Sequence, residues 1–171
     1  RCQIQTANKK LDLTVPVHHQ GKKIIIDKLT IDYIQKWQNT HWRSIQAAYQ
    51  NSPFFDYYSD PIQEIIYSNI NHLFELNSQL LTICLKFLQI DTTIEFSKMY
   101  DKKVESGVFD ARSMIHPKKE LSNLEWFTAS PYYQIFGKDF AKNLSILDLL
   151  FNEGPMALKV LKSSIVIKEN Y

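Results

Sequence analysis

Residues 35–58 contain the sequence feature that most constrains the fold. In and just before this segment, large apolar and aromatic side chains recur at spacings of three and four residues, which places them along one side of an α-helix. The members of this stripe are Ile34, Trp37, His41, Ile45 and Ala48, with Trp42 and Tyr49 on its flank. The opposite side carries Lys36, Thr40, Arg43 and Gln50. The pattern predicts an amphipathic helix in the core of the domain.

The end of this helix is predicted at Asn51-Ser52-Pro53. A proline cannot continue the backbone hydrogen-bond ladder, and it disfavours the helical conformation in the residue before it. Four aromatic residues follow, namely Phe54, Phe55, Tyr57 and Tyr58. We expect them in a turn that folds back onto the helix.

His41 and Arg43 each have two interpretations. As functional groups, His41 would be an acid–base or binding group that titrates near neutral pH, and Arg43 would bind an anion. As structural groups, His41 would be a hydrogen-bonded histidine beside the tryptophans, and Arg43 would be solvated on the surface. The spacing alone favours the structural interpretation of both residues.

The composition indicates one globular domain. Apolar residues make up 44% of the 171 residues and aromatic residues 13%, which is enough for a substantial core. The net charge of +2 comes from 20 basic and 18 acidic side chains, and this balance argues against a nucleic-acid partner. The two cysteines, Cys2 and Cys84, are too few for a disulfide framework or a zinc site.

Several classes of protein are not indicated by any motif. The four glycines form no phosphate-binding loop, and no metal or cofactor is predicted. No segment has the length and apolarity of a membrane span, and no signal peptide is visible, so a cytoplasmic protein with reduced thiols is expected. The chain begins at Arg1 in what reads as the middle of a strand, so we expect an incomplete N-terminus.

The remaining segments predict an α+β fold in a single domain spanning residues 1–171, with a small mixed sheet packed against four or five helices. The expected strands are residues 2–6, 11–17, 23–27, 92–97 and 132–136, of which the first two are expected to form a hairpin. Beyond the core helix, helices are expected from Asp60 to Leu76, after Asn77 and Ser78 to Leu88, from Ser145 to Gly154, and from Pro155 to Leu161. The segment that ends at Leu88 is apolar on most sides, which predicts a central position.

Polar residues outside these elements also have alternative interpretations. A loop containing His18, His19, Lys22 and Lys23 would bind an anion or a metal, but a solvated turn is favoured. In the long connection at 98–120, Asp110 and Arg112 either pair with each other or hold a ligand. Ser145 and Asp148 have the spacing of a capping box, which explains Asp148 structurally.

Seven motifs in the same order resemble the WbqC-like protein family, in the variety found in Bacteroidetes, without its N-terminal segment. They are RCQI, LTVPV, W-x-x-x-HWRSI-x-x-AY, SPFFDYY, HPKK, YYQIF and LSILDLLFNEGP. The resemblance implies a role in surface-polysaccharide or O-antigen synthesis. It also singles out the matching positions Arg1, His41, Arg43, Tyr49, Arg112 and Gln134. His116 stands where the family has a serine before the proline, so it is a poor candidate for a shared role.

Two hypotheses follow from the residues and the resemblance. In the first, the protein is a transferase that moves an acyl or aminoacyl group onto an activated amino sugar, a small-molecule substrate such as a nucleotide sugar. His41 would be the general base, the arginines would hold phosphate or carboxylate groups, and Tyr49 and Gln134 would orient the substrate. In the second, the protein is a non-catalytic binding or scaffold protein that uses the aromatic cluster at 54–58.

Overall fold

The computed structural model describes residues 1–18, 25–97, 99–100, 102–112, 114, 125–137 and 139–166. The strands are β1 (Cys2–Gln5) and β2 (Lys10–Leu13), and the helices are α1 (Trp37–Tyr49), α2 (Phe55–Tyr67), α3 (Leu73–Phe87), α4 (Ile146–Glu153) and α5 (Ala157–Ser163). Short 3-10 turns lie at Ile26–Lys28 (η1) and Gly154–Met156 (η3). The predicted α+β class and the predicted first hairpin are confirmed.

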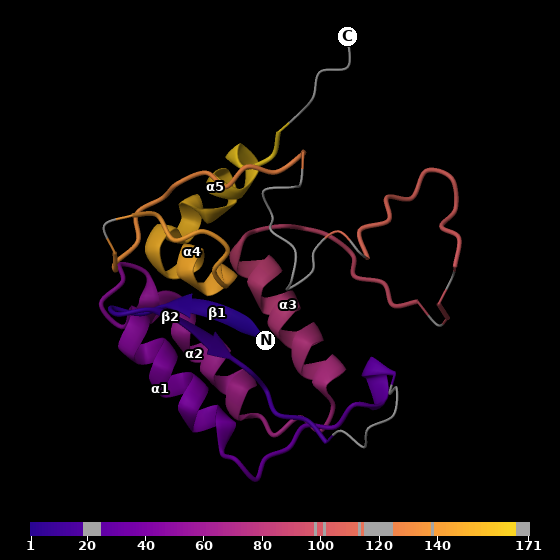
Figure 1. Cartoon of the computed structure of the whole chain (residues 1–171), viewed down its shortest axis with the longest axis horizontal. Coiled ribbons are helices and arrows are strands. Elements are labelled where there is room, and N and C mark those ends of the chain that lie inside the picture. The colour runs from indigo at the N-terminus through magenta and orange to yellow at the C-terminus, as the bar shows by residue number, and fades with distance from the viewer. Residues whose placement is uncertain are drawn as a thin grey trace.

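The hairpin packs on α1 and α4, and α2 lies between α1 and α3 (Figure 1). Its strands are antiparallel, with Cys2 opposite Leu13 and Ile4 opposite Leu11. Side chains alternate between the two faces of a strand, so these four residues share one face. Ile4 and Leu13 are buried on it, as the alternation of apolar residues predicts.

The other predicted strands are wrong where the structure describes them. Residues 92–97 and 132–136 form no ladder, and the described part of 23–27 leads into η1. The strand predicted at 11–17 ends at Leu13, after which Val17 makes only an isolated bridge with Ile31. Thr, Ile and Tyr favour extended backbone, but a strand also needs a partner, and residue type does not supply one.

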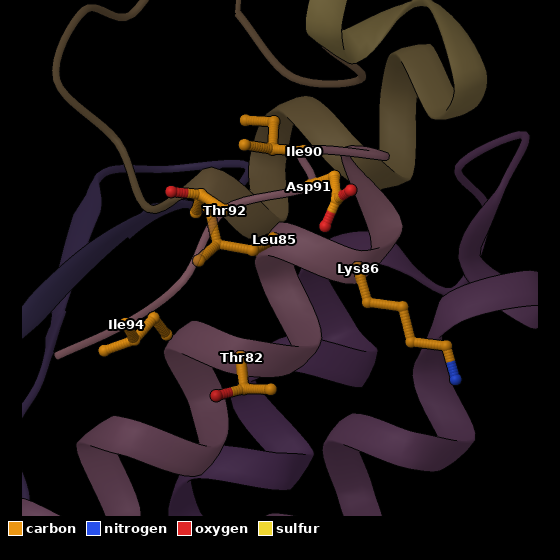
Figure 2. Close-up of a pocket in the computed structure, with 7 residues that line it drawn as sticks. All are labelled: Thr82, Leu85, Lys86, Ile90, Asp91, Thr92 and Ile94. Carbon is orange, nitrogen blue, oxygen red and sulfur yellow. The ribbon is translucent and has the colours of Figure 1, made fainter.

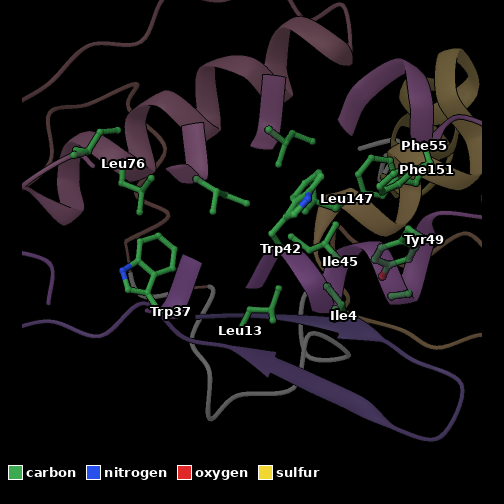
Figure 3. Close-up of a cluster of buried hydrophobic side chains, with 14 of the residues drawn as sticks. Ile4, Leu13, Trp37, Trp42, Ile45, Tyr49, Phe55, Leu76, Leu147 and Phe151 are labelled. Atoms are coloured by element: carbon green, nitrogen blue, oxygen red, sulfur yellow. The ribbon is translucent and has the colours of Figure 1, made fainter. Parts of the chain in front are cut away.

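Helix α1 is the centre of the core, as its spacing predicts. Figure 3 shows Trp37, Trp42 and Ile45 among the side chains that fill the space between the hairpin and the other helices. Ile34 is an exception, because it precedes the helix and is 83% exposed. The helix ends at Tyr49 with Gln50 as its C-cap, directly before Asn51-Ser52-Pro53, so the predicted end is confirmed.

Helix α2 corrects the turn expected at 54–58 and the helix start expected at Asp60. It begins at Phe55, whose ring packs on Trp42 at 6.2 Å and on Phe151 at 5.1 Å between centroids. This burial holds the first turns in place, and Pro61 lies inside the helix although it donates no hydrogen bond. The helix ends at Tyr67, so the expected continuation to Leu76 is also wrong.

Helix α3 runs without a break through Asn77 and Ser78, where a restart was expected. Ser78 points its hydroxyl back at the Phe74 carbonyl, at 2.8 Å, which leaves the helical ladder intact. The helix packs on α2 at one edge of the domain, and Leu81 is 49% exposed. The predicted central position of this segment is therefore wrong.

Candidate functional site

Asp148 is a buried acid in α4, with 1% of its surface exposed. The helix starts where the capping signal places it, because the Ser145 hydroxyl accepts a hydrogen bond from Leu147 N. The other half of the predicted capping box is wrong. The Asp148 carboxylate accepts hydrogen bonds from Tyr132 and Gln134 instead, and Ser145 N donates to the Gln3 carbonyl.

Two side chains donate to the same oxygen of Asp148. Tyr132 Oη lies 2.6 Å from Asp148 Oδ2, and Gln134 Nε2 lies 2.8 Å from it. Gln134 also makes two hydrogen bonds with the backbone of Ala141. Gln134 Nε2 donates to the Ala141 carbonyl oxygen at 3.1 Å, and Gln134 Oε1 accepts from Ala141 N at 2.8 Å. These bonds tie Tyr132, Gln134 and Ala141 to one another and to α4.

Tyr49 brings the hairpin into the same network. Its hydroxyl accepts a hydrogen bond from Gln5 N at 3.3 Å and faces Asp148. Burial, and after it the charge of Asp148, raises the pKa of Tyr49 well above the ordinary value of 10. Burial and the hydrogen bond to Asp148 raise the pKa of Tyr132 in the same way. Both hydroxyls therefore keep their protons near neutral pH.

A cavity of about 340 Å³ opens on the outer side of this network, and we call it the Tyr132 cavity. Its described lining is Tyr132, Tyr133, Gln134, Phe136, Gly137, Asp139 and Phe140. The Phe140 ring packs edge-on against Tyr132, with 5.1 Å between centroids. Aromatic walls with a few fixed polar groups are typical of small-molecule sites.

A second cavity, of about 290 Å³, lies beside the C-terminal half of α3 (Figure 2). It is lined by Thr82, Leu85, Lys86, Ile90, Asp91, Thr92 and Ile94. Figure 2 shows the Lys86 side chain pointing away from Asp91 and from the other lining residues. Its polar groups do not converge on one point, so it is the weaker candidate.

His41 lies in the core, 8% exposed. Its Nε2 is 3.1 Å from the Thr14 carbonyl, so this nitrogen carries the proton, and its ring meets Trp37 edge-on at 5.0 Å. Burial lowers the pKa of His41 below its ordinary value of 6.5, against the opposing effect of the bond to Thr14. These surroundings favour the structural interpretation of His41.

The three arginines singled out from the sequence are not brought together. Arg1 is 3.7 Å from Asp12 at the surface of the hairpin, and Arg43 is exposed on α1. Arg112 makes a two-pronged contact with Asp110, with Nε–Oδ1 at 2.8 Å and a second N–O distance of 2.7 Å. None of the three lines the described part of the Tyr132 cavity.

The Asp110–Arg112 pair matches the interpretation in which these two residues bind each other. The hydrogen bonds from Arg112 hold the pKa of Asp110 at about 2, and the guanidinium also lies 4.9 Å from the centre of the Tyr100 ring. Figure 1 shows the segment at 102–112 extending beyond α3, away from α4. His19, Lys22, Lys23 and His116 lie outside the described residues.

No group of three or more His, Cys, Asp or Glu side chains in the described part of the chain is arranged to hold a metal ion. No helix in the described ranges has both the length and the apolarity needed to cross a membrane.

Of the residues predicted for a site, Tyr49 and Gln134 meet at Asp148. Sequence reasoning missed Asp148 and Tyr132. A signal for Asp148 was present, since it is the only charged residue in the run from Leu147 to Phe151. An acid inside such a run is on a buried face and needs partners. Nothing in the sequence indicated which residues those partners are.

Comparison with known proteins gives one positive result. The searches of curated proteins and of solved structures each found no match. The model of the WbqC-like protein family matches residues 1–121 and 108–160, which together extend over most of the chain. The motifs that resemble this family in the sequence lie within the matched ranges. This chain belongs to the WbqC-like protein family.

Proposed function

We propose that this protein is a cytoplasmic enzyme that acts on an activated sugar in the synthesis of surface polysaccharide such as O antigen, and that the Tyr132 cavity receives the sugar. The carrying observation is the cavity itself, with aromatic walls and a buried carboxylate behind them. The family membership supports the polysaccharide part of the proposal.

The size and lining of the cavity suit a sugar ring. A volume of about 340 Å³ lies at the low end of the range for small-molecule sites, so the nucleotide of a nucleotide sugar would extend outside it. The C–H face of a sugar packs on aromatic rings, here those of Phe136 and Phe140. Its hydroxyls would meet the polar groups of Tyr132, Tyr133 and Asp139.

The proposed reaction is acyl or aminoacyl transfer to a sugar amine. The amine nitrogen forms a bond to the donor's carbonyl carbon, the bond to the leaving group breaks, and a base takes the proton. The sequence hypothesis assigns the base to His41 and the phosphate contacts to Arg1, Arg43 or Arg112, none of which is among the described lining residues of the Tyr132 cavity. His41→Gln tests this role, because the amide still donates to the Thr14 carbonyl but cannot act as a base. Turnover that survives in His41→Gln contradicts a catalytic His41.

The alternative, binding through the aromatic cluster at 54–58, has less support. Phe55 packs on Trp42 and Phe151, Tyr58 packs on Phe87 at 4.7 Å, and Phe54 covers Gly154. Tyr57 is the member of the cluster that is well exposed, at 76%. One exposed ring is a small surface for a partner.

One matched pair of variants separates the two functions. Tyr133 in the Tyr132 cavity and Tyr57 in the aromatic cluster are both exposed, at 67% and 76%, so alanine at either position should leave the fold intact. Wild type would be screened by thermal shift against nucleotide sugars, acyl-CoAs and aminoacyl donors. A ligand at 100 times its Kd stabilises a protein by about 2.7 kcal/mol, which such a screen detects.

We expect a nucleotide-sugar shift that Tyr133→Ala abolishes and Tyr57→Ala preserves. Loss of the shift in Tyr57→Ala alone would favour the aromatic cluster. A panel in which no nucleotide sugar shifts the wild type contradicts the proposed function.

A further inference from the structure

We infer that Asp148 is a positioning residue for the Tyr132 cavity: from α4 it holds the side chains that fix the cavity wall, and it thereby sets how tightly the cavity binds its ligand. The inference rests on the proposed function, because the ligand concerned is the sugar proposed above. Asp148 is 1% exposed and is not among the described lining residues, so it acts through residues that are.

The wall of the cavity is a single segment of the chain. Every described lining residue belongs to residues 132–140, and the described part of this segment forms no helix or strand. Its two ends are joined by side-chain contacts, because the Phe140 ring packs against Tyr132 at 5.1 Å and Gln134 makes two hydrogen bonds with the backbone of Ala141. A wall without a backbone ladder depends on such contacts for its shape.

Asp148 is the point to which these contacts are anchored. Tyr132 Oη and Gln134 Nε2 both donate to its Oδ2, at 2.6 and 2.8 Å, and short hydrogen bonds to an ionised acceptor are stronger than neutral ones. Glu153 adds one bond to α4, which it accepts from Tyr133 N at 3.3 Å. Removal of the Asp148 carboxylate therefore takes away the two shorter of these three bonds.

The position of Asp148 is itself set by the core. Its carboxylate faces Tyr49, a side chain of α1 that is 1% exposed and whose hydroxyl accepts a hydrogen bond from Gln5 N. One turn earlier, Ser145 N donates to the Gln3 carbonyl at 2.6 Å. Binding groups keep their geometry when the residues behind them are locked by packing and hydrogen bonds. Asp148 meets this condition and transmits the position of the core to the wall.

The first test needs no ligand and measures hydrogen exchange of the Ala141 amide by NMR in the full chain. In the described part of the chain this amide bonds to Gln134 and not to Asp148, so its exchange reports on how firmly Gln134 is held. We expect exchange to be at least tenfold faster in Asp148→Ala. It should stay within threefold of wild type in Asp148→Asn, whose amide oxygen can accept both hydrogen bonds.

Two further variants separate positioning from a general loss of stability. Asp148→Leu also removes the acceptor but fills the buried space, so it should behave like Asp148→Ala and replaces it if the alanine variant does not fold. Leu76→Ala removes buried apolar volume in α3 and no group of the network. Its Ala141 amide should exchange within threefold of wild type under conditions in which every variant is folded by circular dichroism.

The second test measures the binding of UDP-glucose and UDP-N-acetylglucosamine by calorimetric titration of the same variants. A wall that is fixed before binding does not have to be ordered by the ligand, so its release should weaken binding. We expect the dissociation constant to rise at least tenfold in Asp148→Ala or Asp148→Leu. It should change less than threefold in Asp148→Asn and in Leu76→Ala.

Unchanged exchange of Ala141 in Asp148→Ala and Asp148→Leu would overturn the inference. Equal acceleration in Leu76→Ala would overturn it as well, since lost stability would then be the cause. Faster exchange with an unchanged dissociation constant would show that the position of the wall does not set binding, which also overturns it. If neither sugar nucleotide binds the wild type, the sugar proposed for this cavity fails, and the exchange of Ala141 alone decides whether Asp148 positions the wall.

Discussion

His41 in α1 and Asp148 in α4 are both buried titratable side chains, but their hydrogen-bond partners differ. The partner of His41 is a backbone carbonyl in the core, and the partners of Asp148 are side chains that line a cavity. His41 has a backbone carbonyl and a tryptophan ring around it, all within the core. Asp148 has donors from a loop that forms the wall of a cavity. The neutral His41 ring is therefore held by the fold alone, whereas the Asp148 carboxylate holds two residues that line the Tyr132 cavity.

The difference shows that the position of a polar residue in a core is less informative than the identity of its partners. Both residues lie within apolar patterns, and both are conspicuous in the sequence. The partner of His41 belongs to the segment just after β2, which packs on α1 as part of the fold. The partners of Asp148 lie in an irregular segment whose described residues form no helix or strand. Irregular segments held on a rigid scaffold are where binding residues concentrate.

The largest expected loss of stability is that of Asp148→Ala. It leaves the Tyr132 hydroxyl and the Gln134 amide without their acceptor, and hydrogen bonds to a charged group are worth roughly 1.5–3 kcal/mol each. We expect the free energy of unfolding to fall by about 4 kcal/mol in urea titrations. Asp148→Asn is the matched variant and should cost less than about 1 kcal/mol, because it keeps an acceptor in place. Equal losses in the two variants would mean that packing, and not the network, stabilises α4.

The second-largest loss of stability is expected for Gly154→Ala. This substitution should disturb the position of α4 without affecting His41. Gly154 has a φ of +52°, and an added Cβ would lie 2.5 Å from the Phe54 ring. Backbone strain and overpacking together should cost about 3 kcal/mol. Gly107→Ala provides the control, since Gly107 also has a positive φ but nothing within 4 Å of the added carbon. Its cost should stay near 1 kcal/mol. Similar melting temperatures for both variants would contradict the crowding at Phe54.

The sequence predicts α1 and the hairpin well because their patterns are local. Trp37, Ile45 and Ala48 specify the buried face of the helix by spacing alone. Tyr132 and Asp148 are 16 residues apart and meet only through the fold, so no local pattern links them. The segment at 132–136 resembles a strand by residue type, but in the structure it has no strand partner and its residues line the Tyr132 cavity.

For helix α3 the sequence predicts more burial than the structure shows. Its apolar residues predict a central helix, since a helix that is apolar on most sides is usually buried. In the structure α2 covers one side of it, and Leu81 remains half exposed. The number of apolar residues in a helix indicates how much of its surface could be buried. Which helix is actually buried depends on how the helices pack against one another.

His41→Ala should destabilise the fold less than the two variants around α4. It removes the donor to the Thr14 carbonyl and leaves a gap beside Trp37, which should cost about 2 kcal/mol. His41→Gln restores a donor and should recover about half of the loss. Neither variant should abolish the nucleotide-sugar shift expected for the Tyr132 cavity, because His41 is not among its described lining residues. Loss of that shift in either variant would mean that His41 contributes to ligand binding.

The smallest expected effect is a pH dependence of the unfolding free energy that is caused by the titration of His41. Because burial lowers the pKa of His41 in the folded state, the unfolded chain binds a proton that the folded chain does not, once the pH falls below about 6.5. The stabilisation is complete above that value and is lost as the pH falls toward the lowered pKa, at no more than about 1.4 kcal/mol per pH unit for one proton. His41→Gln does not titrate, so its unfolding free energy should fall less than that of wild type between pH 7.5 and 5. His72→Gln, at an exposed histidine, should follow wild type. Parallel profiles for wild type and His41→Gln would show that the fold accommodates a charged His41, and the contrast between the two buried groups would then be lost.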